Sequence, residues 1–107
     1  MQDQRRYPRK PVRTPVSVVG PGGVRLDGHS RDLSVGGMFL EAKPAFAFGT
    51  HVHVEIALPL VGTAKLPAIV RWVTPEGIGL QFGLLGARET HAITALVARS
   101  SMPNIGA

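Results

Sequence analysis

The stretch His51-Val52-His53-Val54-Glu55-Ile56-Ala57-Leu58 is the clearest strand signal in the chain, and Pro59 follows it directly. Its larger apolar side chains occupy every second position, and successive side chains of a β-strand point to opposite faces of a sheet. One face of this strand is therefore predicted to be buried and the other exposed. Proline lacks the backbone N–H that a sheet requires, so the strand is predicted to end at Pro59.

The same spacing of two recurs in shorter stretches on both sides of residues 51–58. Turn-forming segments, Gly20-Pro21-Gly22-Gly23 and Pro75-Glu76-Gly77, separate some of these stretches. Trp72 and Phe82 lie within strand-like stretches and are predicted to face the core. The five further predicted strands lie around residues 16–18, 24–26, 38–40, 64–73 and 78–82.

The spacing of the apolar residues changes after Gly83. Residues 87–100 contain neither proline nor glycine, and their apolar side chains recur at spacings of three and four, which is typical of an amphipathic helix. Strands followed by one terminal helix do not supply the crossovers that a parallel sheet requires. The predicted fold is all-β with one helix: six antiparallel strands in a small barrel or sandwich, followed by a C-terminal α-helix. Closing the sheet into a barrel would also hide its edges.

The composition excludes several classes of protein. A chain of 107 residues has room for one compact domain. The absence of cysteine excludes disulfides, thiolate zinc sites, iron–sulfur clusters and a cysteine nucleophile. The sequence contains no apolar run of roughly 18 residues, which a membrane-spanning helix needs, and its N-terminus is polar where a signal peptide is apolar. These features predict a cytoplasmic protein without membrane insertion.

The excess positive charge is concentrated near the N-terminus. Residues 1–13 contain five basic residues and one acidic residue, whereas the remaining residues contain seven basic and six acidic ones. Three prolines in residues 8–15 exclude a helix or a central strand there. We therefore predict a flexible basic arm (residues 1–13), a single domain (14–100) and a tail (101–107). Arginines in the arm can bind phosphate oxygens or stack on a flat base, although terminal runs of charge are also commonly mobile and solvated.

The second polar feature is Asp32-Leu33-Ser34-Val35-Gly36-Gly37, which lies between two strand-like stretches. Aspartate and serine side chains bind nearby backbone groups in tight turns. Glycines allow a positive φ or the close approach of another molecule. By itself, the segment is also what an ordinary turn contains.

Taken together, these two features resemble the PilZ domain family. Arg5-Arg6-Tyr7-Pro8-Arg9 fits the family's RxxxR pattern, and residues 32–37 fit its [D/N]xSxxG pattern. The order of the motifs, the predicted strands and the closing helix also match, so the resemblance covers nearly all of the chain. It implies a PilZ-like β-barrel that serves as a bacterial receptor for the second messenger cyclic di-GMP, in which the arm clamps the ligand against the Asp-Ser-Gly turn.

The resemblance also implies roles for individual residues. Arg5 and Arg9 would contact phosphate and guanine, with Arg6 as a helper. Asp32 would accept hydrogen bonds from guanine or orient an arginine, and Ser34 would donate one to the ligand. Gly36 and Gly37 would complete the site, and Gly37 would let the ligand approach the backbone closely because it has no Cβ atom. Ordering of the arm would pass the signal to an unidentified protein effector.

Some details of this interpretation stay open. Arg9 and Arg13 form a second RxxxR match, although the doubled arginine at Arg5 and Arg6 favours the first. In the family that the chain resembles, the residue before this motif influences whether one ligand or a stacked pair is bound. Here that residue is Gln4, which adds no cation, so both numbers stay open.

Three other functions would each account for part of the sequence. A small barrel that binds nucleic acid would account for the basic arm, but aromatic residues are only 6% of the chain and the charge outside the arm is nearly balanced. A PilZ-like adaptor that binds only proteins is a further alternative. An enzyme or metal site is disfavoured, because His51 and His53 share one strand face without an evident third ligand. We predict no cofactor.

Overall fold

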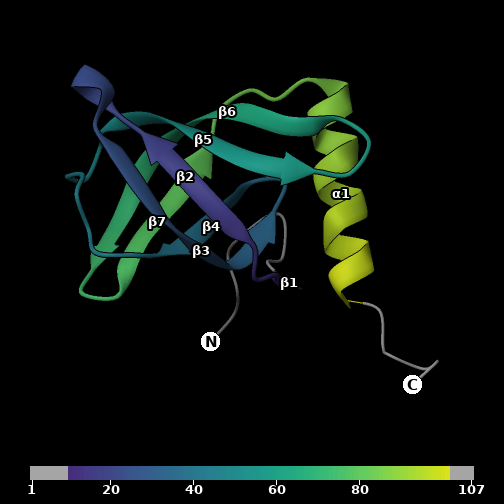
Figure 1. The fold of residues 1–107 in the computed structure, drawn as a ribbon, viewed down its shortest axis with the longest axis horizontal. Helices are drawn as coiled ribbons and strands as arrows, with labels where there is room; N and C mark the ends of the chain where they lie inside the picture. Colours follow the sequence, from purple (N-terminus) through teal and green to yellow (C-terminus); the bar gives the residue numbers. More distant parts are fainter. Residues whose placement is uncertain (1–9, 102–107) are drawn as a thin grey trace.

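The computed structural model describes residues 10–101, and the barrel and helix are arranged as Figure 1 shows. The elements in chain order are β1 (Lys10–Pro11), β2 (Pro15–Val19), η1 (Pro21–Gly23), β3 (Arg25–Ser34), β4 (Gly37–Glu41), β5 (His51–Leu58), β6 (Gly62–Thr74), β7 (Gly77–Phe82) and α1 (Ala87–Ser101).

Six of the strands close into an antiparallel barrel. Neighbouring strands follow the order β3-β2-β5-β6-β7-β4, and β4 pairs with β3 to complete the circle. The short strand β1 adds to β3 outside this circle. The predicted six-stranded barrel with a C-terminal helix is confirmed.

The strand at residues 51–58 has the two faces that its sequence predicts. Val52, Val54, Ile56 and Leu58 are buried, whereas His51 and His53 are exposed. β5 pairs with β2 on one side and β6 on the other, and its buried side chains belong to the hydrophobic core.

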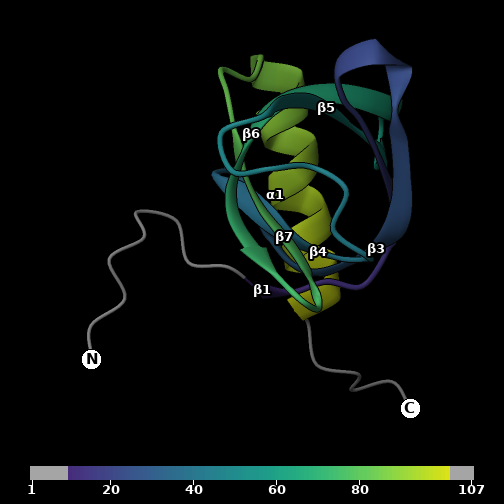
Figure 2. The same ribbon diagram turned by 90° about the vertical axis from the view of Figure 1, so that its left-hand side faces the viewer.

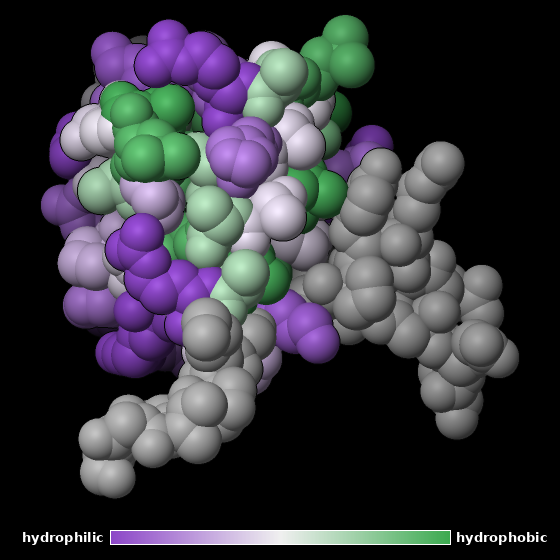
Figure 3. All heavy atoms as spheres, turned by 90° about the vertical axis from the view of Figure 1, so that its right-hand side faces the viewer, coloured by the Kyte–Doolittle hydropathy of each residue, from purple (hydrophilic) through white to green (hydrophobic). Residues whose placement is uncertain are grey.

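Helix α1 closes one end of the barrel. It contacts β1, β3 and β5, and it buries Ala92 and Ile93 in the core. Figure 2 looks along the barrel and shows α1 across the far end. Figure 3 shows the opposite side, on the right in Figure 1, where separate groups of apolar side chains lie between polar ones. Within the described residues, no helix has the length and hydropathy needed to cross a membrane.

The prediction for Trp72 is wrong. Its side chain is 53% exposed, whereas Phe82 is buried as predicted. The pairing of β6 with β7 shifts between Val70 and Trp72, so Arg71 is an extra residue on β6. Such a β-bulge moves the following side chains to the opposite face of the strand, and it therefore places Trp72 on the outside of the barrel.

The last residues of the predicted arm are attached to the barrel. Lys10 pairs with Leu33 and Pro11 with Asp32 along β3, and Val12 is buried in the core. The candidate ligand arginines Arg5, Arg6 and Arg9 lie outside the described residues, as does nearly all of the predicted tail.

Candidate functional site

The segment predicted as a turn at residues 32–37 is mostly strand. β3 continues through Ser34 and β4 begins at Gly37, so the turn contains only Val35 and Gly36. The Gly36 N–H donates to Ser34 Oγ at 3.0 Å, and the Gly36 carbonyl accepts from the Phe82 N–H at 2.9 Å. These contacts fix the turn against the end of β7.

A positive φ is not the reason for the glycine pair. The described glycines with a positive φ are Gly22, Gly23, Gly49 and Gly62. Gly36 and Gly37 are not in this set, so of the two roles that the sequence suggests for them, the close approach of another molecule stays a prediction. Gly37 pairs with Gln81 of β7, and it is buried.

A β-bulge in β3 places Asp32 on the outer face of the barrel. Ser30 pairs with Leu40 and Asp32 pairs with Phe39, so Arg31 is an extra residue between them. In a regular strand, Ser30 and Asp32 would share a face. Because of the bulge, Ser30 points into the core, where it is fully buried, and Asp32 lies on the opposite face.

One oxygen of the Asp32 carboxylate is fixed by the neighbouring strand. Oδ1 accepts a hydrogen bond from the backbone N–H of Phe39 at 3.0 Å. Asp32 is half-buried. Ser34, two residues along β3, is nearly fully buried beside it. The structure thus brings Asp32, Ser34, Gly36 and Gly37 together at one end of the β3–β4 hairpin.

Beside the β3 bulge, three charged side chains and an aromatic ring form a chain of contacts. The Arg31 guanidinium lies over the Phe39 ring, 4.2 Å from its centroid, and Arg31 Nε donates to Glu41 Oε2 at 3.1 Å. Arg13 donates to Glu41 Oε1 at 2.6 Å. The hydrogen bond from Arg13, and then that from Arg31, hold the pKa of Glu41 below its ordinary value. We call Arg31, Asp32, Phe39 and Glu41 the bulge site.

An aromatic surface extends from the bulge site across the outside of the barrel. Asp32 pairs with Phe39, Phe39 with Gly79, and Gly79 with Trp72, so these residues form one row over β3, β4, β7 and β6. A Cβ atom at Gly79 would lie 2.5 Å from Cε3 of Trp72. The indole therefore lies over a position where only glycine fits. The sequence did not indicate this row, because it depends on both bulges.

The buried hydroxyl of Ser30 attaches the arm to β3. Ser30 Oγ accepts from the Thr14 N–H at 3.1 Å and donates to the Val12 carbonyl. The Ser30 N–H also donates to the Thr14 carbonyl at 2.9 Å. These bonds bridge the break between β1 and β2, and they direct Pro11 and Lys10 along β3 toward Asp32 and Leu33.

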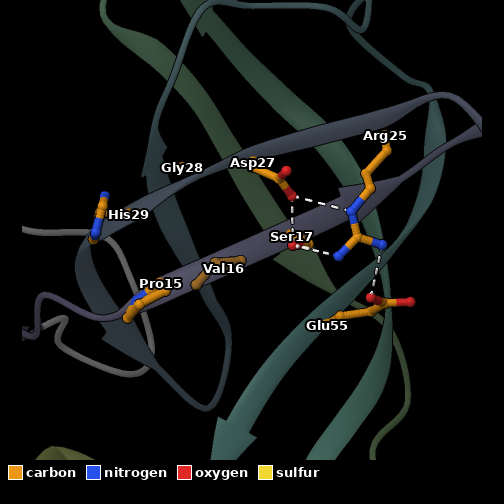
Figure 4. Close-up of a pocket in the computed structure, with 8 residues that line it drawn as sticks. All are labelled: Pro15, Val16, Ser17, Arg25, Asp27, Gly28, His29 and Glu55. Atoms are coloured by element: carbon orange, nitrogen blue, oxygen red, sulfur yellow. Dashed lines mark hydrogen bonds and ion pairs between the residues drawn. The ribbon is translucent and has the colours of Figure 1, made fainter.

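A second polar cluster lies on the outer face near the other end of β3. Ser17, Arg25, Asp27 and Glu55 line a shallow depression and bond to one another (Figure 4). We call these four residues the hairpin network. Across residues 10–101, no three histidine or acidic side chains come close enough together to hold a metal ion.

Comparison with protein families identifies the fold. The model for the PilZ domain matches residues 3–99. The chain belongs to the PilZ domain family. A search of curated proteins found no significant match.

Solved structures of PilZ domains agree with this assignment. The PilZ domain of CeSA from a cellulose-synthesizing bacterium has a TM-score of 0.72 and 20% identity, over 89% of this chain and 99% of that one. The PilZ domain of YcgR from Escherichia coli, solved with cyclic di-GMP, has a TM-score of 0.73 and 16% identity, over 91% of each chain.

A third similar structure is the Bacillus subtilis inhibitor of motility, MotI/DgrA. It has a TM-score of 0.74 and 18% identity over 92% of this PilZ chain. The match covers 52% of MotI, so this chain spans about half the length of that protein.

Proposed function

We propose that this PilZ protein is a cyclic di-GMP receptor that binds its ligand between the basic arm and the outer face of the β3–β4 hairpin. The observation that carries this proposal is the pairing of Lys10 with Leu33 and of Pro11 with Asp32. Lys10 directly follows the RxxxR motif in the sequence, so its position on β3 supports an arm that approaches the Asp-x-Ser motif.

The chemistry of the two motifs is complementary to a cyclic dinucleotide. Arg5 and Arg9 would bind phosphate and guanine, with Arg6 adding charge. Asp32 would accept from guanine N–H groups or orient an arginine, and Ser34 would donate to the ligand. Gly36 and Gly37 carry no Cβ atom and would leave room for the ligand at the turn.

The expected affinity follows from a few charge-assisted contacts. Each contributes roughly 1.5–3 kcal/mol net. Three or four of them, less the cost of ordering the arm, give a dissociation constant of about micromolar or tighter.

We assign no catalytic role to the protein, and we place it in the cytoplasm.

The output of this receptor is a change in the arm. Lys10 and Pro11 already pair with β3, so ligand binding would order the arm residues that precede them and so present a new surface to a protein partner. NMR relaxation of these residues with and without cyclic di-GMP tests this step, and equal mobility in both states would contradict it.

Calorimetric titration of the full chain tests the proposal directly. We expect saturable binding of cyclic di-GMP at about 0.15 M salt, without comparable binding of GMP or a short oligonucleotide. Arg9→Ala should weaken binding at least about tenfold, because a charge-assisted contact is lost. Lys10→Ala is the matched control, since it removes the same charge from an exposed neighbouring side chain.

Two other outcomes would replace the proposal. Salt-sensitive binding to the oligonucleotide without binding of cyclic di-GMP would indicate a nucleic-acid-binding barrel. No binding of either ligand would indicate an adaptor that recognises proteins. Trp72 gives a second readout, because it is the single tryptophan of the chain and lies in the same row as Asp32.

A further inference from the structure

We propose that Arg31 is an additional ligand-binding residue, contributed by the barrel, and that its guanidinium binds a phosphodiester group of the ligand. This inference rests on the proposed function and names a contact that neither sequence motif contains. It would give the ligand a cation on the rigid surface in addition to those on the arm.

The β3 bulge puts Arg31 beside the ligand-binding acid. Neighbouring residues of a regular strand point to opposite faces, so an arginine next to Asp32 would ordinarily be on the other side of the sheet. Here Arg31 is the extra residue of the bulge, and both side chains reach the outer face. Bulges commonly re-aim side chains next to functional sites.

Two contacts orient the guanidinium of Arg31. It stacks 4.2 Å from the centroid of Phe39, and its Nε donates to Glu41. Its Nη1 and Nη2 atoms form no hydrogen bond with another residue in the range 10–101. These two nitrogens form the edge that binds a phosphate in a bidentate way. Prior orientation of the plane lowers the entropy cost of that contact.

Glu41 alone does not cancel the positive charge at this position. Two guanidiniums, those of Arg13 and Arg31, share its one carboxylate. With the neighbouring Asp32 carboxylate, the two guanidiniums and the two carboxylates balance. The attraction for an anion is therefore local to the Nη1 and Nη2 edge of Arg31, which bonds to neither carboxylate.

Arg25 is an internal comparison for Arg31. Both lie on the outer face of β3, with side chains 53% and 50% exposed respectively, and both pair with carboxylates. Arg25 donates to Asp27 from Nε, to Glu55 from Nη1 and to Ser17 from Nη2. Its hydrogen-bonding edge is occupied, whereas the corresponding edge of Arg31 is not bonded to the described residues.

Calorimetric titration with cyclic di-GMP at about 0.15 M salt separates a direct contact from a general charge effect. We compare the wild-type chain with Arg31→Gln and Arg25→Gln, which change the net charge equally. Loss of a charge-assisted contact should make Arg31→Gln bind at least about tenfold more weakly. Arg25→Gln should change the dissociation constant less than about twofold, because salt screens the remote charge.

The controls distinguish the ways in which the inference can fail. Equal effects of Arg31→Gln and Arg25→Gln would overturn the Arg31 contact and leave the proposed function intact. Absence of binding by the wild-type chain would overturn both. Arg31→Lys keeps the charge without the planar fork, so it should still weaken binding several-fold. Wild-type affinity in Arg31→Lys would rule out a bidentate contact even if Arg31→Gln does not fold.

Discussion

The outer face of β3 carries an arginine and an aspartate toward each of its ends. Arg25 and Asp27 follow the β2–β3 turn, and Arg31 and Asp32 precede the β3–β4 turn. In the hairpin network, regular pairing aligns Ser17 with Asp27 on one side and Glu55 on the other. Ser17 donates to Asp27 at 2.6 Å, and Arg25 bonds to all three other members (Figure 4).

The bulge site uses the same residue types in an irregular strand. Here the arginine and the aspartate are neighbours in sequence, and the Asp32 carboxylate accepts from a backbone N–H. The Arg31 guanidinium stacks on a ring and bonds to one shared carboxylate. A closed set of mutual contacts is typical of a structural cluster. In the bulge site, by contrast, the Nη atoms of Arg31 bond to no other residue in the range 10–101, so this guanidinium edge can bind an anion.

Replacing the two aspartates gives the largest expected difference between these regions. Asp32→Ala should weaken cyclic di-GMP binding about 100-fold, because a charged acceptor at the ligand is lost. Asp27→Ala removes the same charge from the hairpin network and should leave the dissociation constant nearly unchanged. Titration calorimetry of both variants provides the comparison. Equal losses would mean that net charge, rather than the bulge site, determines affinity.

Two serines provide the next comparison, with stability as the measurement. Ser30 is fully buried and bonds to Val12 and Thr14, whereas Ser17 bonds to exposed side chains. Ser30→Ala should lower the free energy of unfolding by about 2 kcal/mol, because buried backbone groups lose their partner. Ser17→Ala should cost less than about 1 kcal/mol, since water can replace the hydroxyl.

Urea unfolding followed by circular dichroism measures both effects. Similar small losses would show that the Ser30 hydroxyl does not fix the arm to β3. A further expectation is that Ser30→Ala weakens cyclic di-GMP binding, since the Ser30 hydroxyl holds the base of the arm on β3. Ser17→Ala should leave ligand binding unchanged.

The sequence predicts the fold well because most strands keep a regular alternation. The pattern at residues 51–58 gives both the strand and its buried face, and the loss of that pattern after Gly83 gives the helix. The wrong position of Trp72 has a physical cause. A bulge adds one residue to a strand, and its location depends on how the neighbouring strand pairs with it. Sequence spacing alone does not contain that information.

The same limit applies to the site. Asp32 and Ser34 belong to a short motif, so their types and spacing are visible in the sequence. Arg31, Phe39 and Glu41 come together through the β3 bulge and the pairing of β3 with β4. The one local signal for Arg31 is its position directly before Asp32. Neither its ring contact nor its carboxylate partner can be obtained from spacing.

The smallest expected effects concern the pH titration of Glu41 and Asp27. The pKa of each carboxylate is lowered, but by different partners. The pKa of Glu41 is lowered first by the hydrogen bond from Arg13 and then by that from Arg31. The pKa of Asp27 is lowered first by the hydrogen bond from Ser17, with Arg25 as the second favourable partner. NMR titration of the side-chain carboxyl carbons should therefore place both midpoints below the ordinary values of about 4.3 for glutamate and 3.9 for aspartate.

Variants should change these midpoints separately. Arg13→Ala should raise the pKa of Glu41 and leave that of Asp27 unchanged. Ser17→Ala should raise the pKa of Asp27 and leave that of Glu41 unchanged. Because both pKa values are lower in the folded state, both groups favour folding above their ordinary pKa values, and this contribution disappears as the pH falls through the folded values. The effect on stability should be small, because both carboxylates are exposed to solvent. Ordinary midpoints in the wild-type chain would mean that the ion pairs at both ends of β3 do not persist in solution, and the difference between the two regions would then rest on the bulge and the Phe39 ring alone.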